Sequence, residues 1–73
     1  MINNTNIKVP KKYHHMIDEI YQDEDGYWCE TAKGYQAASV DRECHTIHED
    51  TQKEILFHIK YIKPCNCDDC KKI

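Results

Sequence analysis

The clearest pattern of apolar and polar positions lies near the C-terminal end of the chain and predicts an amphipathic helix. Its apolar residues recur at helical spacing on one face, namely Ile55, Leu56, Ile59 and Ile62. Thr51 and Glu54 form a T-x-x-E capping box, which favours a helix start at Thr51; Thr46 and Glu49 form a second box that would start it a turn earlier. We expect one helix that ends before Pro64, because a proline disfavours helical backbone in the residue before it.

Shorter stretches upstream of this helix predict strands. Residues 27–31 are rich in aromatic side chains and follow a turn sequence at 23–26, residues 35–40 follow a second turn, and residues 44–48 alternate in character. Residues 13–22 fit either a helix face or the first arm of a hairpin. The apolar helix stripe can cover one face of such a sheet. The sequence therefore predicts an α+β fold in β-β-β-α order, a small antiparallel sheet of about three strands under one C-terminal helix.

The length of 73 residues leaves room for one domain. We expect a flexible N-terminal arm over residues 1–12, anchored by Ile7 and Val9, then an α+β domain over 13–63 and a cysteine-rich tail over 64–73. A chain this short buries only about 60% of the surface that its unfolded form exposes. It would gain stability from a bound metal or from a partner subunit, so we also expect a homo-oligomer.

Charge and hydropathy exclude some functions. Thirteen acidic and ten basic side chains give a net charge of −3, which argues against a nucleic-acid-binding protein that relies on basic patches. No apolar run approaches the length of a membrane span, and the first residues lack the apolar core of a signal peptide. We expect a cytoplasmic protein that binds neither membrane nor nucleic acid.

A cysteine cluster follows the expected helix, with the spacing C-x-C-x2-C: Cys65, Cys67 and Cys70. Short loops can bring thiolates to the roughly 2.3 Å that zinc requires. His58, one turn from the helix end, is the expected fourth ligand, whereas Cys44, His45 and His48 would need the tail to fold back. Five cysteines in a reducing compartment favour thiols or metal ligands over a disulfide framework. The alternative is a frayed tail whose thiols bind nothing. The sequence thus predicts a structural zinc site as one of two outcomes.

Aromatic side chains on the expected strands are candidate binding residues for a ligand or partner: Tyr21, Tyr27, Trp28 and Tyr35. Tyrosine and tryptophan are enriched at interfaces and can stack on a base or a peptide. The alternative is that they fill the core of the small sheet, since the chain has a single phenylalanine.

The sequence argues against catalysis by a thiol. Cys29 or Cys44 could pair with His45 or His48 as nucleophile and base. Cys44 and His45 are adjacent, however, and adjacent strand residues point to opposite faces. Two glycines in the whole chain do not provide a glycine-rich oxyanion loop. We expect a non-enzymatic protein.

The runs DEDGYWCETAKGY and CHTIHEDTQKEILFHI resemble the N-terminal domain of HicB-type antitoxins over about residues 16–62. In that family a hairpin with a D-G turn and an aromatic second strand leads into the helix start. The positions that match are Cys44, Thr46, Asp50, Thr51 and Glu54. Glu43 stands where the family has glycine, the P-D-L-P turn is missing, and no DNA-binding segment follows the helix. The resemblance implies a partial ribonuclease-H-like sheet and an antitoxin that binds a small ribonuclease toxin.

The short length, together with the strings CHTIHEDT and CNCDDC, also resembles small proteins encoded by phages and mobile elements of Firmicutes. That resemblance implies a stoichiometric inhibitor or sequestering protein, aimed at a host defence protein or at a small nucleotide signal. Three hypotheses therefore stand: a phage-type binding protein, a HicB-like antitoxin and a structural zinc module.

Overall fold

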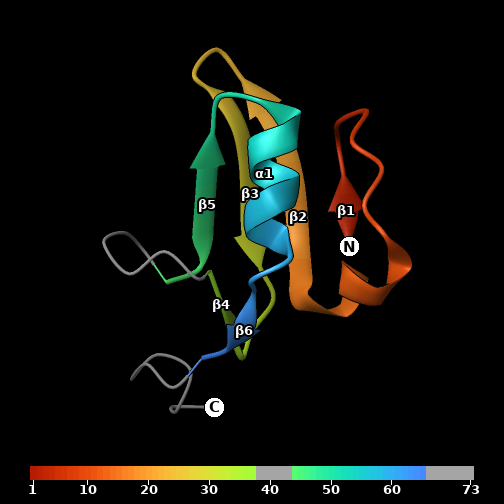
Figure 1. Ribbon diagram of the computed structural model, residues 1–73, viewed down its shortest axis with the longest axis vertical. Coiled ribbons are helices and arrows are strands. Elements are labelled where there is room, and N and C mark those ends of the chain that lie inside the picture. The colour runs from red at the N-terminus through yellow and green to blue at the C-terminus, as the bar shows by residue number, and fades with distance from the viewer. Residues whose placement is uncertain (38–43, 66–73) are drawn as a thin grey trace.

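The computed structural model describes residues 1–37 and 44–65, and it packs one helix against one face of a small sheet (Figure 1). The main sheet has four strands in the order β1 (Ile2–Asn3), β2 (Ile17–Asp23), β3 (Gly26–Thr31) and β5 (Thr46–Glu49). The helix, α1, spans Gln52–Ile59. The α+β class predicted from the sequence is confirmed.

The centre of the sheet is an antiparallel hairpin formed by β2 and β3. Residues 13–22, which the sequence left open, divide between a 3-10 helix, η1 (Lys11–Met16), and strand β2. Two residues connect the strands, and the side chain of Asp23 accepts a hydrogen bond of 2.8 Å from the backbone N–H of Asp25. Gly26 closes the turn with a φ of +127°, a conformation that glycine adopts without the steric cost of a Cβ.

The sheet contains one strand that the sequence did not predict. β1 pairs with β2 in parallel, with Ile2 opposite Glu19, so the sheet is mixed rather than antiparallel throughout. A strand of two exposed residues gives no alternating pattern, so the polar composition and Pro10 of residues 1–12 predict a flexible arm instead. In the same segment Ile7 is buried and Val9 packs against the core, so their predicted anchoring is confirmed.

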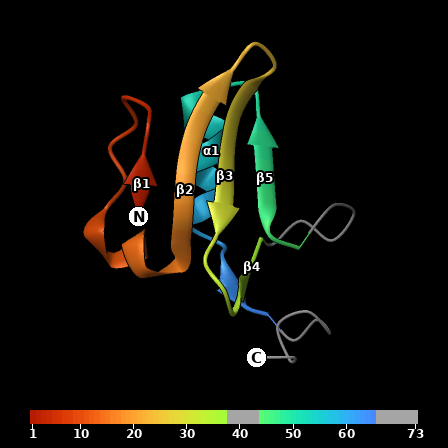
Figure 2. The same cartoon turned by 180° about the vertical axis from the view of Figure 1, so that it is seen from behind.

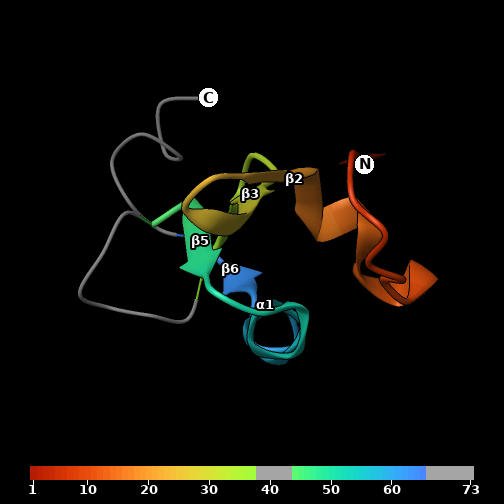
Figure 3. The same cartoon turned by 90° about the horizontal axis from the view of Figure 1, so that it is seen from above.

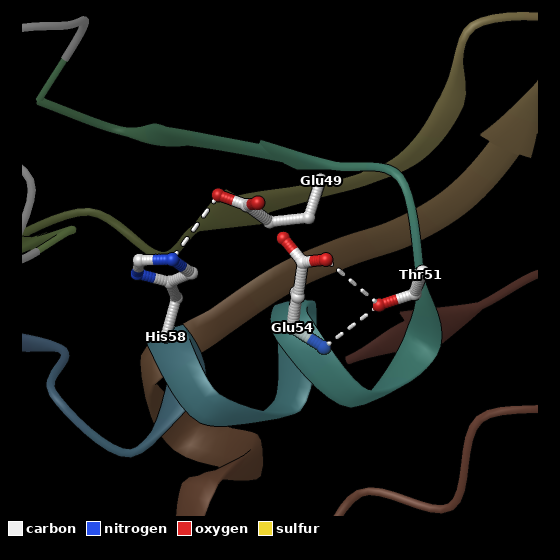
Figure 4. A network of polar contacts seen from close by, with 4 residues as sticks. All are labelled: Glu49, Thr51, Glu54 and His58. Carbon is white, nitrogen blue, oxygen red and sulfur yellow. Dashed lines mark hydrogen bonds and ion pairs between the residues drawn. The ribbon is translucent and has the colours of Figure 1, made fainter.

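Helix α1 starts where the capping box predicts. The Thr51 hydroxyl accepts a bond of 3.2 Å from the backbone N–H of Glu54, and it lies 3.3 Å from the Glu54 carboxylate, to which it donates (Figure 4). The Glu54 carboxylate therefore contacts the Thr51 hydroxyl rather than the Thr51 backbone N–H, which it would contact in a complete capping box. The helix ends at Ile59, about a turn before Pro64, because Ile62 bonds to the carbonyl three residues back in a tighter turn.

The core lies between α1 and the face of the sheet that it covers. Ile55 and Ile59 are fully buried and Ile62 is nearly so, while Leu56 packs beside them, which confirms the predicted stripe. The sheet contributes four buried side chains to this core, Ile17, Ile20, Cys29 and Ile47. Burial of such apolar area is the main favourable term in folding.

A second sheet, a two-stranded ribbon, lies at the lower end of the molecule as drawn in Figure 1. β4 (Tyr35–Gln36) pairs antiparallel with β6 (Lys63–Pro64), and the N–H of Cys65 bonds to the carbonyl of Gly34 at 2.8 Å. Of the strand predicted over 35–40, residues 38–40 lie outside the described residues, as do 66–73 of the predicted tail. Pro64, expected to begin the tail, belongs to this ribbon, whose edge tolerates a residue without an N–H. In the part of the chain that the structure describes, no helix has the length and apolar character of a membrane span.

Candidate functional site

The face of the sheet opposite α1 carries a row of three rings from three adjacent strands. The strand register sets Tyr21 opposite Trp28 and Trp28 opposite His48. The Tyr21 and Trp28 rings are stacked with centroids 6.1 Å apart, and the Trp28 and His48 rings with centroids 4.0 Å apart. Figure 2 shows this side of the sheet with α1 behind it, and no other described element lies over it. We call Tyr21, Trp28 and His48 the aromatic row; all three are partly exposed.

The turn between β2 and β3 holds the histidine of the row in place. His48 Nε2 lies 2.8 Å from the backbone oxygen of Asp25, and because a carbonyl only accepts, this nitrogen carries the hydrogen. Gly26 allows this approach: a Cβ there would lie 2.7 Å from the backbone oxygen of Glu49 and 3.3 Å from His48 Nε2. A glycine at position 26 is therefore needed for β5 to lie this close to the turn, with the His48 ring beside Trp28.

The indole nitrogen of Trp28 is buried, and within the described part of the chain it has no hydrogen-bond partner of ordinary geometry. It nevertheless makes the largest contribution to a lowered pKa of Asp23, ahead of the backbone N–H of Asp25. We infer that the indole N–H faces this carboxylate from beyond normal hydrogen-bond range. A buried donor without a full partner costs free energy, so the row is not arranged for stability alone.

Carboxylates surround the aromatic row. Glu19 and Glu30 are opposite each other on β2 and β3, two pairs along from Tyr21 and Trp28 and therefore on the same face, and Asp23 lies on the other side. Burial contributes most to the raised pKa of the Tyr21 phenol, and the charges of Glu30, Asp23 and Glu19 raise that pKa further. Like charges directly opposite each other weaken a sheet. The open face is therefore aromatic and acidic, and it retains an unfavourable pair of like charges, Glu19 and Glu30.

The four predicted binding residues do not form one surface. Tyr21 and Trp28 lie in the aromatic row, whereas Tyr27 packs against the core and its hydroxyl lies 3.3 Å from the side-chain nitrogen of Gln52. Tyr35 also packs against the core, and its ring meets the edge of His15 at 5.7 Å. Successive strand residues point to opposite faces, which separates Tyr27 from Trp28.

His48 was missed as a member of the aromatic row. The sequence suggested it only as a metal ligand or a base. The alternation over residues 44–48 predicted a strand, but the ring contact depends on the register between β5 and β3. That register joins positions 20 residues apart and leaves no signal in either strand alone.

The predicted metal ligands are only partly described. His58, the expected fourth ligand, has its Nε2 atom 3.1 Å from a carboxylate oxygen of Glu49 (Figure 4). Cys65 instead lies beside His45, with 3.9 Å between Sγ and Nε2. Cys67 and Cys70 lie outside the described residues. Among residues 1–37 and 44–65, no group of three or more His, Cys, Asp or Glu side chains is close enough together to hold a metal ion.

The orientation of the His45 ring suits a metal ligand. Its Nδ1 atom lies 2.8 Å from the carbonyl oxygen of Tyr35, so Nδ1 carries a hydrogen, and in the neutral ring Nε2 presents its lone pair on the side of Cys65. The buried Thr31 hydroxyl donates to the same carbonyl at 2.9 Å. Zinc-bound histidines usually donate their second ring N–H in this way. Tetrahedral zinc separates sulfur from nitrogen by roughly 3.6 Å, close to the distance seen here.

Cys29 lies on the covered face and is fully buried. Burial, with a smaller contribution from Glu30, raises the pKa of its thiol to about 12. The thiolate is the reactive form of cysteine, so burial disfavours nucleophilic chemistry at this residue near neutral pH. Cys29 therefore packs as a small apolar side chain.

The described residues thus present two candidate sites of different chemistry. The carboxylates around the aromatic row suit noncovalent binding of a cationic group, which they attract electrostatically. The corner formed by His45 and Cys65 suits a metal ion. Comparisons of the chain with protein-family models, with curated proteins and with solved structures find no match.

Proposed function

We propose that the protein is a small non-enzymatic binding protein that holds a basic segment of a partner protein on its aromatic row. The observation that carries the proposal is the stack of Tyr21, Trp28 and His48 among carboxylates, on a sheet face that no described element covers. The carboxylates attract guanidinium and ammonium groups, and a guanidinium can stack on a ring face that its neighbours in the row leave uncovered. The resemblance to phage and mobile-element proteins makes a host protein the proposed partner, with inhibition by stoichiometric sequestration.

Charge favours a protein partner over the small nucleotide signal that the sequence also suggested. The aromatic row could stack a base, but Glu19, Glu30 and Asp23 would repel the phosphates attached to it. Two like charges at 4 Å cost about 1 kcal/mol even in bulk water, and about four times more near a protein surface. A basic peptide segment gains from the same charges.

Trp28 fluorescence tests this choice directly, because the chain has one tryptophan. The protein is titrated with acetyl-hexa-arginine amide and, in parallel, with ATP. We expect a saturable change with the peptide that weakens as salt is raised, since salt screens exposed charges. A saturable response to ATP without a response to the peptide would contradict the proposed partner chemistry.

Capture from host-cell lysate, read by mass spectrometry, identifies the partner. Trp28→Ala removes the centre of the aromatic row, and Tyr61→Ala, which truncates a 54% exposed aromatic after α1, is the matched control. We expect wild type and Tyr61→Ala to capture the same protein and Trp28→Ala to lose it. Circular dichroism checks that each variant is folded. Equal capture by folded Trp28→Ala would remove the aromatic row as the site.

The acidic open face also favours a second candidate, a HicB-like antitoxin. A ribonuclease toxin binds the phosphate backbone of RNA through basic residues, and such a surface complements Glu19 and Glu30. The discriminating test is co-expression with a ribonuclease encoded beside this gene. Rescue of growth by wild type but not by Trp28→Ala would support the antitoxin, and absence of rescue would leave the phage-type inhibitor.

The contact between His45 and Cys65 favours a structural zinc site as an additional role. We propose His45 in place of His58 as the histidine ligand, since His58 contacts Glu49, with Cys67 and Cys70 as the remaining proposed donors. Native mass spectrometry should show one zinc that is lost in His45→Ala and kept in His58→Ala. The reverse result would return the role to His58, and a mass unchanged by chelator would remove the metal.

A further inference from the structure

A groove of opposite charge lies on the other side of the molecule. It runs between α1 and the N-terminal segment that precedes β2 and has a volume of about 350 Å³. Figure 3 shows α1 on one side of the sheet and the N-terminal segment beyond the β2 edge. Six of its lining residues carry the argument: Lys8, Tyr13, Lys53, Leu56, Phe57 and Lys60.

The floor of this groove is apolar and remains accessible. Tyr13 and Leu56 are partly buried and pack against the core beneath it. Phe57 is 55% exposed, although phenylalanine is among the residues most often buried. An exposed ring beside a concave apolar floor is the usual composition of a small-molecule site.

Three lysines surround this floor and are available to an anion. Among the described residues, no ion pair involves Lys8, Lys53 or Lys60. Two acidic side chains near the start of α1 are engaged elsewhere, because Glu49 contacts His58 and Glu54 contacts Thr51 (Figure 4). The groove thus combines apolar surface with three positive charges that these carboxylates do not neutralise.

We propose that this groove binds a small amphipathic anion, a carboxylate attached to an apolar chain or ring. The chain packs on Leu56 and Phe57, and the carboxylate accepts hydrogen bonds from the lysine ammonium groups. The volume lies at the lower end of the range for small-molecule sites, roughly 300 to 1,000 Å³.

This site is independent of the proposed partner-binding function. It uses α1 and the N-terminal segment rather than the open face of the sheet, and its charge is of opposite sign. A ligand in the groove would contact none of the three rings of the aromatic row. Either proposal can fail without the other.

Titration of isotope-labelled protein with decanoate, followed by amide chemical shifts in NMR spectra, tests the site. We expect saturable shifts in residues 8–13 and 53–60, with none at the indole N–H of Trp28. Decanol, which has the same chain without the charge, should bind several-fold more weakly. An absence of saturable shifts in the groove would overturn the proposal.

Lysine variants test the role of charge. The double variant Lys53→Gln, Lys60→Gln should weaken decanoate binding about five- to tenfold, because exposed charge pairs each contribute modestly. The matched double variant Lys33→Gln, Lys63→Gln removes the same charge outside the groove and should bind as wild type does. Both doubles change exposed side chains and are checked for folding by circular dichroism.

Two outcomes would overturn the assignment of an anion. Equal affinities for decanoate and decanol would make the groove a general apolar site. Equal affinities in the two double variants would show that its lysines do not contribute. Shifts in the groove that change with protein concentration alone would instead place a second copy of the chain there.

Discussion

The two faces of the sheet use neighbouring residues of the same strands for different purposes. Cys29 is fully buried beneath α1 while Trp28, the residue before it, stacks on the open face; Ile47 and His48 divide in the same way. The covered face buries apolar side chains, which is what stabilises the fold. The open face keeps a like-charge pair and a buried indole donor without an ordinary partner, features that cost stability. This difference supports the proposal that the covered face serves folding and the open face serves binding.

The largest expected effect comes from the covered face. Ile59→Ala should lower the free energy of unfolding by about 2 to 5 kcal/mol, because it leaves a cavity under a fully buried side chain. Phe57→Ala, on the exposed side of the same helix, should cost less than about 1 kcal/mol. Chemical denaturation of both variants measures the contrast, and equal losses would break the distinction between covered and exposed positions.

The hairpin turn links the two faces. Gly26→Ala should lower the free energy of unfolding by about 2 kcal/mol or more. The added Cβ meets the Glu49 carbonyl, and the positive φ at this position strains any residue other than glycine. Gly34→Ala is the matched control, because Gly34 also has a positive φ but has nothing within 4 Å of the added Cβ. It should cost only about 1 to 2 kcal/mol. Thermal melts that rank Gly34→Ala as the more damaging change would contradict the close approach of β5.

A pH titration tests the burial of Cys29 on the covered face. The pKa of Cys29 is raised from 9.0 to about 12, so above pH 9 the unfolded thiol loses its proton while the folded one keeps it. Stability from this residue is therefore complete below about pH 8, one unit under the unfolded pKa, and falls as pH rises further, by up to about 1.4 kcal/mol per pH unit.

The comparison with Cys29→Ala isolates this effect, because the other titrating groups are common to both proteins. The stability advantage of wild type over the variant should shrink between about pH 8 and about pH 10.5. Denaturant melts across this range measure it. A constant advantage would mean that Cys29 ionises as readily in the folded state as in the unfolded one.

Local patterns predicted the elements whose signals are contained within a single segment. The stripe of Ile55 and Ile59 gave the helix, the cap at Thr51 gave its start, and the aromatic run over 27–31 gave the second strand of the hairpin. Each depends on spacing or on hydrogen bonds between residues a few positions apart.

Contacts between distant segments were not predicted. The parallel pairing of β1 needs residues 2 and 19 to meet, and the His48 ring reaches Trp28 only through the register of β5. The ribbon formed by β4 and β6 likewise brings Cys65 to His45 rather than to His58. Pairings of this kind depend on how the whole chain closes, so no short sequence window carries their signal.

The most direct test of the central claim is to measure stability and binding together in Glu30→Gln. This change removes one charge of the pair between Glu19 and Glu30 beside the aromatic row. We expect a free energy of unfolding that is unchanged or higher, by about 0.2 to 1 kcal/mol. We also expect weaker binding of acetyl-hexa-arginine amide at Trp28. Lower stability together with unchanged binding would show that the carboxylates serve the fold, and it would contradict the assignment of this face to a partner.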